Sequence, residues 1–226
     1  MKVIRNHRGY PQRVAVEHVR PGRRPGPKPR LSRELIVDAA VEMGVESVSI
    51  GAVAATLGVA PAGLYRYIDG RDDLVAAGLE RILGEAPLPP ADSDWRAFLE
   101  AEAWTRWSLL RRFAGLVRRH QGRLVWVAAR RVEQLVRGLV ERDFALADAM
   151  TAVDAVLDLI HDAADQAARL HDPDDPDRSS QSMRAVLDAY SPDLRAAVAA
   201  MVADPVRHVE RKLALILDGI GNRYAT

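Results

Sequence analysis

Apolar residues recur every three to four positions from residue 32 almost to the end of this chain, and this spacing is the feature that most constrains its fold. Such a period places apolar side chains along one face of an α-helix. No segment alternates apolar and polar residues over the length of a strand, and the sequence has no internal repeat. The pattern therefore predicts an all-α protein.

Helix breakers divide the chain into three regions. Residues 1–30 end in PGRRPGPKPR, whose prolines and glycines exclude a regular element, so we expect a flexible arm there. Residues 31–84 show short helical patterns punctuated by glycine, whereas longer patterns follow the proline-rich segment APLPP. We therefore expect an N-terminal head over 31–84, which includes a connecting helix, and a helical body over 85–226.

The head is expected to contain three short helices before the connecting helix. Ser32 and Ser49 can cap the first two, because a serine side chain accepts hydrogen bonds from first-turn amides. Gly44 and Gly58 follow these two helices, where glycine commonly ends a helix. A third short helix comes after Gly58, and the connecting helix runs to about residue 84.

The body is expected to consist of longer helices. The periodicity places them over residues 93–110, 124–143, 145–170, 183–202 and 204–222, with a shorter irregular helix after the first and a polar loop over 171–182. Ser191 and Pro192 interrupt the fourth of these, as a cap and a proline that restart it. The last helix carries more apolar residues than one face needs, namely Leu213, Leu215, Ile216, Leu217 and Ile220. This excess predicts a homodimer formed through the last two helices.

Charge is distributed unevenly along the chain. The first 30 residues hold nine lysines and arginines against one glutamate, a net charge of +8, whereas the whole chain carries +1, which leaves −7 for the remainder. A basic arm on an acidic body suits a protein that holds a polyanion at one end. A solubilising tail would have the same composition, so charge alone leaves both interpretations open.

The composition also excludes several classes of protein. There is no cysteine, which excludes disulfides, thiolate metal sites and cysteine nucleophiles. No stretch approaches about 18 apolar residues, and the N-terminus lacks the apolar block of a signal peptide, so we expect a cytoplasmic protein without a membrane span. Since no phosphate-binding loop and no common hydrolase or metalloprotease motif occurs, we expect neither catalysis nor a cofactor.

The head contains a candidate helix-turn-helix unit. Two short helical segments are joined by Gly58-Val59-Ala60, and a tight glycine turn is what such a unit requires. In the second segment, PAGLYRYI, Leu64 and Ile68 have the spacing of inward anchors. The other side chains of this segment then face outward, as expected for a recognition helix that enters the major groove of DNA.

The run from residue 31 to 74, LSRELIVDAAVEMGVESVSIGAVAATLGVAPAGLYRYIDGRDDL, closely resembles the DNA-binding head of the tetracycline-repressor (TetR) family. The residues that fit that family's pattern directly are Gly58, Val59, Leu64, Tyr65, Asp73 and Leu74. The departures, each to a residue of similar role, are Ala60 for serine, Ala62 for glycine, Tyr67 for histidine, Ile68 for phenylalanine and Arg71 for lysine. The changes at Ala60 and Tyr67 should alter the preferred DNA sequence.

The resemblance implies a set of DNA contacts. Phosphate contacts are expected from Ser49, Tyr65, Tyr67 and Arg71, base-edge contacts from Ala62, Gly63 and Arg66, and close approach at Ala60 and Pro61. Arginines of the arm, Arg23, Arg24 and Arg30, are expected in or beside the minor groove. Alternatives stay open, because Tyr65 could only pack locally, Arg66 could be a solvated surface residue, and the arm could be a passive tail.

The resemblance also implies an effector pocket in the body. Four tryptophans and two phenylalanines fall within residues 95–126, and the candidate ligand-binding residues are Trp104, Trp107, Trp126 and Met150. Such a lining hints at an apolar or aromatic effector, although each tryptophan could equally serve core or interface packing. The segment HVERKLALILDGI, residues 208–220, is similar to the family's terminal dimerisation helix.

One stripe of polar residues could hold a metal ion. His161 lies among Asp154, Asp158, Asp162 and Asp165, of which Asp158 and Asp165 are three and four residues away, so an imidazole and carboxylates share a helix face. A solvated charge stripe has the same pattern and is much commoner. No metal site is therefore expected.

Taken together, these features predict a ligand-responsive transcriptional regulator, most simply a repressor. It would bind a palindromic double-stranded DNA operator as a homodimer and be released by a small-molecule effector bound in the body. Two other readings stay open. One is a DNA-binding regulator without an effector, and the other is a small-molecule-binding helical protein with a vestigial head.

Overall fold

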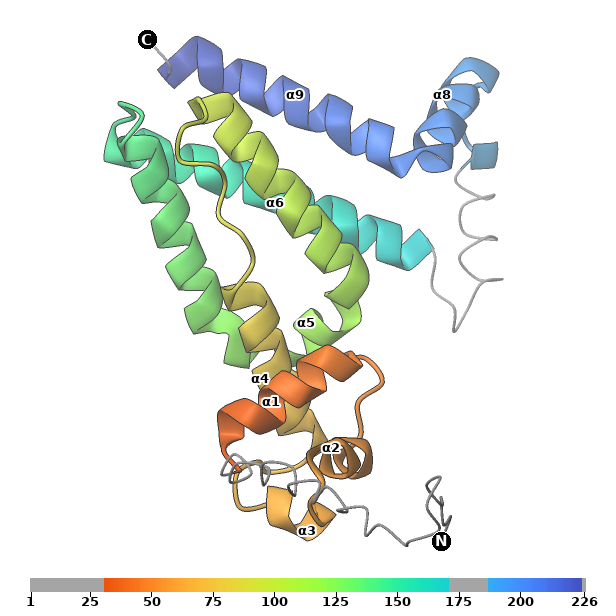
Figure 1. Cartoon of the computed structure of the whole chain (residues 1–226). Helices are drawn as coiled ribbons and strands as arrows, with labels where there is room; N and C mark the ends of the chain where they lie inside the picture. Colours follow the sequence, from red (N-terminus) through yellow and green to blue (C-terminus); the bar gives the residue numbers. More distant parts are fainter. Residues whose placement is uncertain (1–30, 171–186, 225–226) are drawn as a thin grey trace, which may run out of the picture. The chain divides into compact units, whose positions relative to one another are not determined.

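In the computed structural model, residues 31–170 and 187–224 are described, and every regular element within these ranges is a helix (Figure 1). The all-α prediction is therefore confirmed. The elements are α1 (Arg33–Met43), α2 (Ile50–Leu57), α3 (Pro61–Leu64), α4 (Arg71–Gly84), α5 (Trp95–Val140), α6 (Leu146–Leu170), α8 (Pro192–Ala203) and α9 (Pro205–Tyr224). Among these helices none is long and apolar enough to cross a membrane. The described residues from Ser32 onward belong to one compact unit.

The caps expected from the sequence set the helix boundaries in the head. The Oγ of Ser32 accepts a hydrogen bond from the Leu35 amide at 3.2 Å, and the Oγ of Ser49 accepts one from the Ala52 amide at the same distance. Each bond satisfies an amide that the first turn of a helix leaves without a partner. Gly44 then ends α1, as expected.

Helix α5 folds back on itself. A straight helix of its 46 residues would be about 69 Å long, at about 1.5 Å per residue. Yet the Phe98 ring lies against the backbone of Gly138, and the Arg131 guanidinium donates to the Glu102 carboxylate at 3.0 Å. The helix must therefore reverse between residues 111 and 123, and Figure 1 shows its two arms running in opposite directions.

The two arms of α5 correspond to the helices expected over 93–110 and 124–143. The difference lies between them, where the helical backbone continues through the reversal instead of breaking. The connecting sequence explains this, because RRFAGLVRRHQGR contains two glycines that permit bending but no proline that would end the helix.

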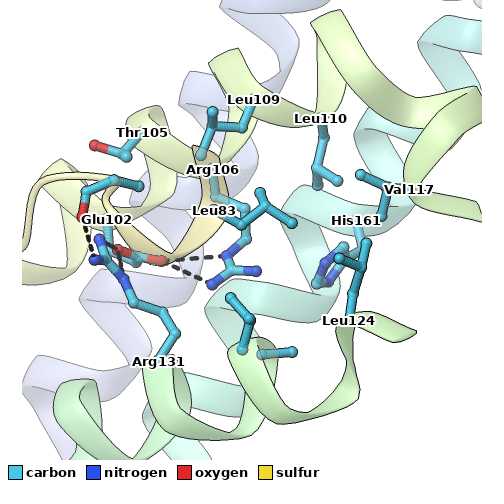
Figure 2. Close-up of a pocket in the computed structure, with 13 residues that line it drawn as sticks. Leu83, Glu102, Thr105, Arg106, Leu109, Leu110, Val117, Leu124, Arg131 and His161 are labelled. Carbon is cyan, nitrogen blue, oxygen red and sulfur yellow. Dashed lines mark hydrogen bonds and ion pairs between the residues drawn. The ribbon is translucent and has the colours of Figure 1, made fainter. Parts of the chain in front are cut away.

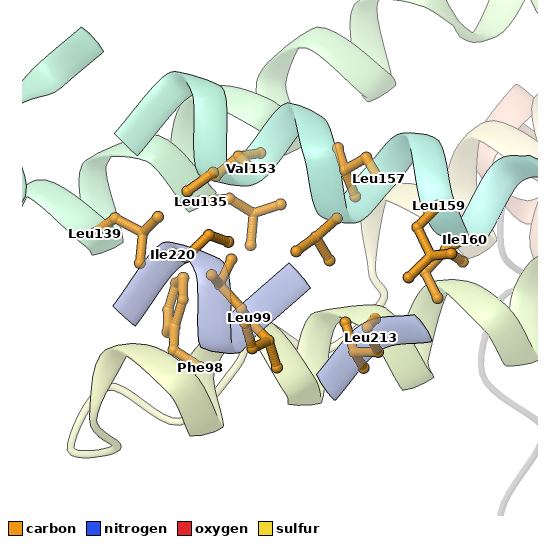
Figure 3. Packing of buried hydrophobic residues seen from close by; sticks show 14 of the residues in the cluster. Phe98, Leu99, Leu135, Leu139, Val153, Leu157, Leu159, Ile160, Leu213 and Ile220 are labelled. Carbon is orange, nitrogen blue, oxygen red and sulfur yellow. The ribbon is translucent and has the colours of Figure 1, made fainter. Parts of the chain in front are cut away.

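The main core joins both arms of α5 to α6 and α9 (Figure 3). Its buried members include Leu99, Leu135 and Leu139 from α5, Val156 and Ile160 from α6, and Leu213, Leu217 and Ile220 from α9. The Trp95 and Phe144 rings close one end, with their centroids 5.8 Å apart. The expected apolar faces of α6 and α9 are largely confirmed.

Some expected core positions are exposed instead. Three-to-four spacing places Val125 and Ala129 on one apolar face of the second α5 arm and Leu146 and Met150 on that of α6, but all four lie at the surface, while Leu124 and Leu135 are buried. The buried face therefore differs from the predicted one at the start of the second α5 arm, whereas Val136 and Leu139 further along this arm are buried as the spacing predicts. Helical spacing alone permits both faces, because each contains apolar residues at three- and four-residue intervals.

Helix α4 is buried all around in its middle. Six consecutive residues, from Leu74 to Leu79, are buried, because α4 packs against both α1 and α5. A Cβ added to Gly78 would lie 2.5 Å from a methyl group of Val45, so this packing depends on glycine. The connecting helix is thus held between the head helices and the body helices.

Replacing Gly138 should test the close approach of the two α5 arms. A Cβ at this position would lie 2.4 Å from the Cζ of Phe98, whose ring is buried and covered by the Arg142 guanidinium at 4.2 Å. We expect Gly138→Ala to lower the free energy of unfolding by about 1–3 kcal/mol, because overpacking outweighs the better helix propensity of alanine.

Urea denaturation followed by circular dichroism measures this effect. Gly51→Ala is the control, since Gly51 is an exposed helical residue of α2 with nothing within 4 Å of an added Cβ. The control should be neutral or stabilising. Equal effects of the two substitutions would contradict the close approach of the arms.

Candidate functional site

The turn between α2 and α3 has the geometry of a helix-turn-helix. Gly58 adopts a left-handed conformation, with φ of +65° and ψ of +37°, which glycine reaches without steric cost. The Val59 amide donates back to the Ala54 carbonyl at 3.0 Å and closes the end of α2. The chain therefore turns sharply and enters α3 at Pro61.

The recognition segment is short and is anchored by two residues. Regular helix covers only Pro61–Leu64, after which the Tyr67 and Ile68 amides both donate to the Leu64 carbonyl, at 2.8 and 3.1 Å. Leu64 and Ile68 are fully buried, as their spacing predicted. The other side chains of the segment are free to face outward.

The structure describes most of the predicted DNA-contacting residues and leaves them accessible. Ser49, Ala60, Pro61, Ala62, Tyr65, Arg66 and Arg71 are exposed, and Gly63 and Tyr67 are half-buried. Tyr65 is 58% exposed, so it does not merely fill the core beside Leu64. The predicted contacts of Arg23, Arg24 and Arg30 lie outside the described residues.

Arg71 has intramolecular partners that the sequence did not predict. Its Nε donates to the Val48 carbonyl at 2.8 Å and its Nη2 to the Glu46 carbonyl at 3.2 Å. These bonds tie the first turn of α4 to the loop between α1 and α2. A phosphate contact by Arg71 would therefore involve a side chain that is already held in place.

Asp73 is the centre of the ionic contacts beneath the recognition segment. Its two carboxylate oxygens accept from both terminal nitrogens of Arg33, each at 2.8 Å, and from the Asp69 amide at 3.0 Å. Arg123 of α5 adds a contact at 3.1 Å. Arg33 also donates to the Tyr67 carbonyl at 2.6 Å, so the same pair supports the end of the recognition segment.

These contacts perturb the carboxylate of Asp73. The hydrogen bonds from Arg33 hold the pKa of Asp73 well below its usual range, burial opposes the shift, and the Asp69 amide and Arg123 add to it. Hydrogen bonds to the charged form favour that form. The group therefore stays ionised through the whole range in which the protein is expected to work.

Two further ion pairs join the head to α5. Arg123 also contacts Glu80 of α4 at 3.4 Å, and Arg112 contacts Glu46 at 2.6 Å. These pairs are more exposed than the Asp73 cluster and contribute less to stability. Their positions show that the reversal of α5 lies against the head.

The body contains a cavity of about 90 Å³ between the end of α4, both arms of α5, and α6 (Figure 2). Its lining is mostly apolar, with a few polar groups that converge on one side. The lining residues are Leu83, Ala86, Glu102, Thr105, Arg106, Leu109, Leu110, Val117, Leu124, Val127, Ala128, Arg131 and His161.

None of the predicted ligand-binding residues lines this cavity. Trp107 is buried in the main core, Trp104 packs against that core, Trp126 is 82% exposed, and Met150 lies at the surface. Aromatic clustering in the sequence therefore did not indicate the cavity. Among the polar residues that do line it, Glu102 and Arg131 are 29 residues apart, so no local pattern joins them.

A buried carboxylate lies at the polar side of the cavity. Glu102, only 2% exposed, accepts hydrogen bonds from Arg106 at 2.9 Å and from Arg131 at 3.0 Å. Arg131 also donates to the carbonyls of Ala86 and Pro87, at 2.9 and 2.7 Å. One side chain thus connects the cavity to the segment that follows α4.

His161 of α6 forms the opposite side of the cavity. Although the residue has an exposed edge, desolvation of its ring and the nearby Arg106 guanidinium lower the pKa of His161. The aspartates around it do not form a metal site with it, since no group of three potential ligands comes together among the described residues.

The chain is similar to known proteins over most of its length. Residues 86–224 match the family described as tetracyclin repressor-like, C-terminal domain. The tetracycline repressor protein class A from transposon 1721 of Escherichia coli is 31% identical over 192 residues, which cover 83% of this chain and 87% of that protein. The chain belongs to the TetR family.

Other relatives of this TetR-family protein are also transcriptional regulators. The repressor DrrR1 of Streptomyces coeruleorubidus is 41% identical over 110 residues, which cover 45% of this chain and 41% of that protein. The regulator SCO7222 of Streptomyces coelicolor, itself described as a TetR, is 27% identical, with a TM-score of 0.58 over 84% of this chain and 97% of that chain. The suspected family and the fold class are thus confirmed.

Two groups of charged residues in this TetR-family protein differ in how far apart their members lie in the sequence. Glu102 and Arg106 are four residues apart, a spacing at which helical side chains meet, so this pair was detectable. Arg33 and Asp73 are 40 residues apart, and Glu102 and Arg131 are 29 apart. No local pattern indicates such pairs.

Removing the charge of Asp73 should weaken both the fold and the support of the recognition segment. We expect Asp73→Asn to lower the free energy of unfolding by about 1–3 kcal/mol at neutral pH, because Arg33 loses its charged partner. The pKa of Asp73 is depressed in the folded state. The stabilisation by its carboxylate is therefore fully present at pH values above the ordinary pKa range of carboxyl groups, and it decreases as the pH falls below that range. The difference from the unmodified protein should therefore shrink in acid.

Chemical denaturation at pH 7 and at pH 3–4 measures both effects. Asp72→Asn is the control, because Asp72 is an exposed carboxylate in the same first turn of α4. It should lose only a helix-dipole interaction of about 0.3–1 kcal/mol. A deficit for Asp73→Asn that does not change with pH would contradict the role given to the carboxylate charge.

Proposed function

We propose that this TetR-family regulator is a ligand-responsive repressor, which binds a palindromic operator as a homodimer and leaves it when a small molecule enters the body. The observation that carries the proposal is the position of α4. Its first turn is bonded to the head, and the segment after its last turn borders the body cavity. The names of both curated relatives describe repressors, which supports repression over activation.

The head would read DNA through the exposed side of the recognition segment. Arg66 is exposed and follows two small positions, Ala62 and Gly63, that let the backbone approach the bases. An arginine can donate two hydrogen bonds to a guanine edge in the major groove. Tyr65 would instead donate to a phosphate, as would groups at the start of α2, where Ser49 leaves amides exposed.

A homodimer would cover apolar surface on the last two helices. No residue of α8 is buried, although it carries Leu194 and Met201, and Leu215 of α9 is 74% exposed. Leu213 and Leu217 on the other face of α9 are packed into the core of the same chain. A helix with apolar residues on both faces needs a second partner, and a second copy of the same helices supplies a self-complementary one.

Effector binding would act on α4 through its C-terminal end. Leu83 and Ala86 line the cavity, and Arg131 holds the carbonyls of Ala86 and Pro87. A ligand that enlarges the cavity would displace this segment and the helix attached to it. Release from DNA then follows if the ligand binds better to the displaced arrangement than to the DNA-bound one.

A regulator without an effector is the second candidate. The observation that favours it is the size of the cavity, since about 90 Å³ is smaller than the roughly 300–1,000 Å³ of most ligand sites. The cavity would then be a packing defect that contains water. Ligand-binding measurements distinguish the two candidates, because only the first requires a saturable site in the body.

Replacing Arg66 and replacing Tyr65 should weaken DNA binding in different ways. If Arg66 reads a guanine, Arg66→Ala should cost about 1–3 kcal/mol on the operator and relax the preference at one position in each half-site. Tyr65→Phe should weaken binding to operator and to unrelated DNA by a similar factor, because phosphates carry no sequence information.

Fluorescence anisotropy with the operator and with a scrambled duplex measures both variants. The two residues are adjacent and exposed, so each variant serves as the control for the folding of the other. If Arg66→Ala weakens binding to both duplexes equally, Arg66 contacts only phosphates. Sequence reading would then have to come from Tyr67, the arm or the shape of the DNA.

Leu215 tests the proposed dimer. A Leu215→Glu substitution places two charges in an isologous interface and removes two apolar contacts. We therefore expect the dissociation constant of the dimer to rise at least about tenfold. Sedimentation velocity at micromolar concentration measures this. Leu88→Glu is the control and should leave the dimer intact, because Leu88 is also an exposed leucine but lies in the segment between α4 and α5. A monomeric unmodified protein would contradict the two-headed mechanism.

A further inference from the structure

The charged groups that line the body cavity do not cancel. Arg106 and Arg131 share one carboxylate, that of Glu102, so the polar side of the cavity carries a net charge of +1. The other ionisable lining residue is His161, whose pKa is lowered by desolvation and by the Arg106 guanidinium, so that its neutral form is favoured. An uncompensated charge that is withdrawn from water is costly, and a ligand of opposite charge removes that cost.

Arg106 is the residue that can receive such a ligand. Its Nε and Nη2 both donate to Glu102, at 3.2 and 2.9 Å, whereas its Nη1 has no partner among the residues the structure describes. Arg131, by contrast, uses all three of its nitrogens on Glu102 and the two carbonyls after α4. Figure 2 shows the Arg106 guanidinium between Glu102 and His161, within the cavity.

An outer hollow adjoins the cavity on the side of His161. This hollow, of about 390 Å³, shares Leu110, Val117 and His161 with the cavity. Its aspartates are compensated, because Asp165 pairs with Arg118 at 3.5 Å and Asp162 with Lys212 at 3.8 Å. The unbalanced positive charge is therefore on the inner side, and the shared apolar residues leave room for the uncharged part of a ligand.

We propose that the effector of this regulator is a monoanion with an apolar body, such as an aromatic or aliphatic carboxylate, whose charged oxygens accept hydrogen bonds from Nη1 of Arg106. This inference rests on the proposed function and specifies the chemical class of its ligand. The apolar body packs against Leu83, Leu110 and Val127, which line the cavity. A neutral compound of the same shape leaves the guanidinium without a partner, and a cation is repelled.

Paired ligands on the full-length protein test the proposal. Benzoate, 1-naphthoate and decanoate are titrated by calorimetry, each beside its own primary amide, which has nearly the same shape without the charge. We expect the carboxylates to bind about 10- to 100-fold more tightly than their amides, because hydrogen bonds to a charged group are worth more than neutral ones.

Two substitutions should move this ratio in opposite directions. Arg106→Met removes the net charge and should bring the ratio of carboxylate to amide affinity close to one, without weakening the amide. Glu102→Gln raises the net charge and should increase the ratio. Arg130→Met is the control, because it removes an exposed arginine of the same α5 arm as Arg131 that does not line the cavity, and it should leave the ratio unchanged. Circular dichroism identifies any variant that fails to fold.

His161 supplies a second measurement that needs no substitution. A bound carboxylate offsets the repulsion from Arg106, so the pKa of His161, followed by NMR of its ring protons, should rise on addition of the carboxylate and not on addition of the amide. This readout also places the charged end of the ligand beside α6.

The outcomes separate this proposal from the proposed function. Amides that bind as tightly as the carboxylates, or a ratio that Arg106→Met leaves unchanged, would overturn the monoanion and leave a ligand-responsive regulator in place. Failure of every pair to bind, in a protein that still binds its operator, would overturn this cavity as the effector site and favour a regulator without an effector.

Discussion

The ion pair between Arg33 and Asp73 is the contact on which the arrangement of the head depends. The recognition segment has only one turn of regular helix, so its own backbone bonds cannot fix its orientation. Asp73 accepts from the Asp69 amide at the end of that segment, and Arg33 donates to the Tyr67 carbonyl. Because the carboxylate is largely buried and fully bonded, this small cluster fixes α1, the recognition segment and the start of α4 as one body.

Helix α4 is held at both ends by arginines that act on different parts of the protein. At its first turn, Arg71 donates to carbonyls of the loop between α1 and α2. Beyond its last turn, Arg131 donates to the carbonyls of Ala86 and Pro87. In the middle of the helix, close packing around Gly78 leaves little space for independent movement. In the proposed mechanism, a displacement at the cavity would be transmitted along this helix to the head.

The cavity exists because α5 reverses on itself. Phe98 packs tightly against Gly138, which brings the two arms together at the ends far from the reversal. Closer to the reversal, Arg106, Leu110 and Leu124 line a space between the arms and α6. The same reversal brings Glu102 next to Arg131. A single topological feature thus produces both the space for a ligand and the charge that would select it.

Local sequence determined much of this protein. Serine caps, glycines at helix ends and three-to-four apolar spacing predicted the helices of the head. The spacing of Leu64 and Ile68 predicted how the recognition segment is anchored. Each of these signals acts within a few residues, so it can be read from the local sequence. The tertiary structure decided which face of the second α5 arm is buried, and it decided that the aromatic cluster packs while polar residues line the cavity. It also decided the pairing of Asp73 with Arg33 and of Glu102 with Arg131. These contacts join residues far apart in the chain, and apolar periodicity has the same appearance whichever neighbour covers the face, so only the packed chain could determine them.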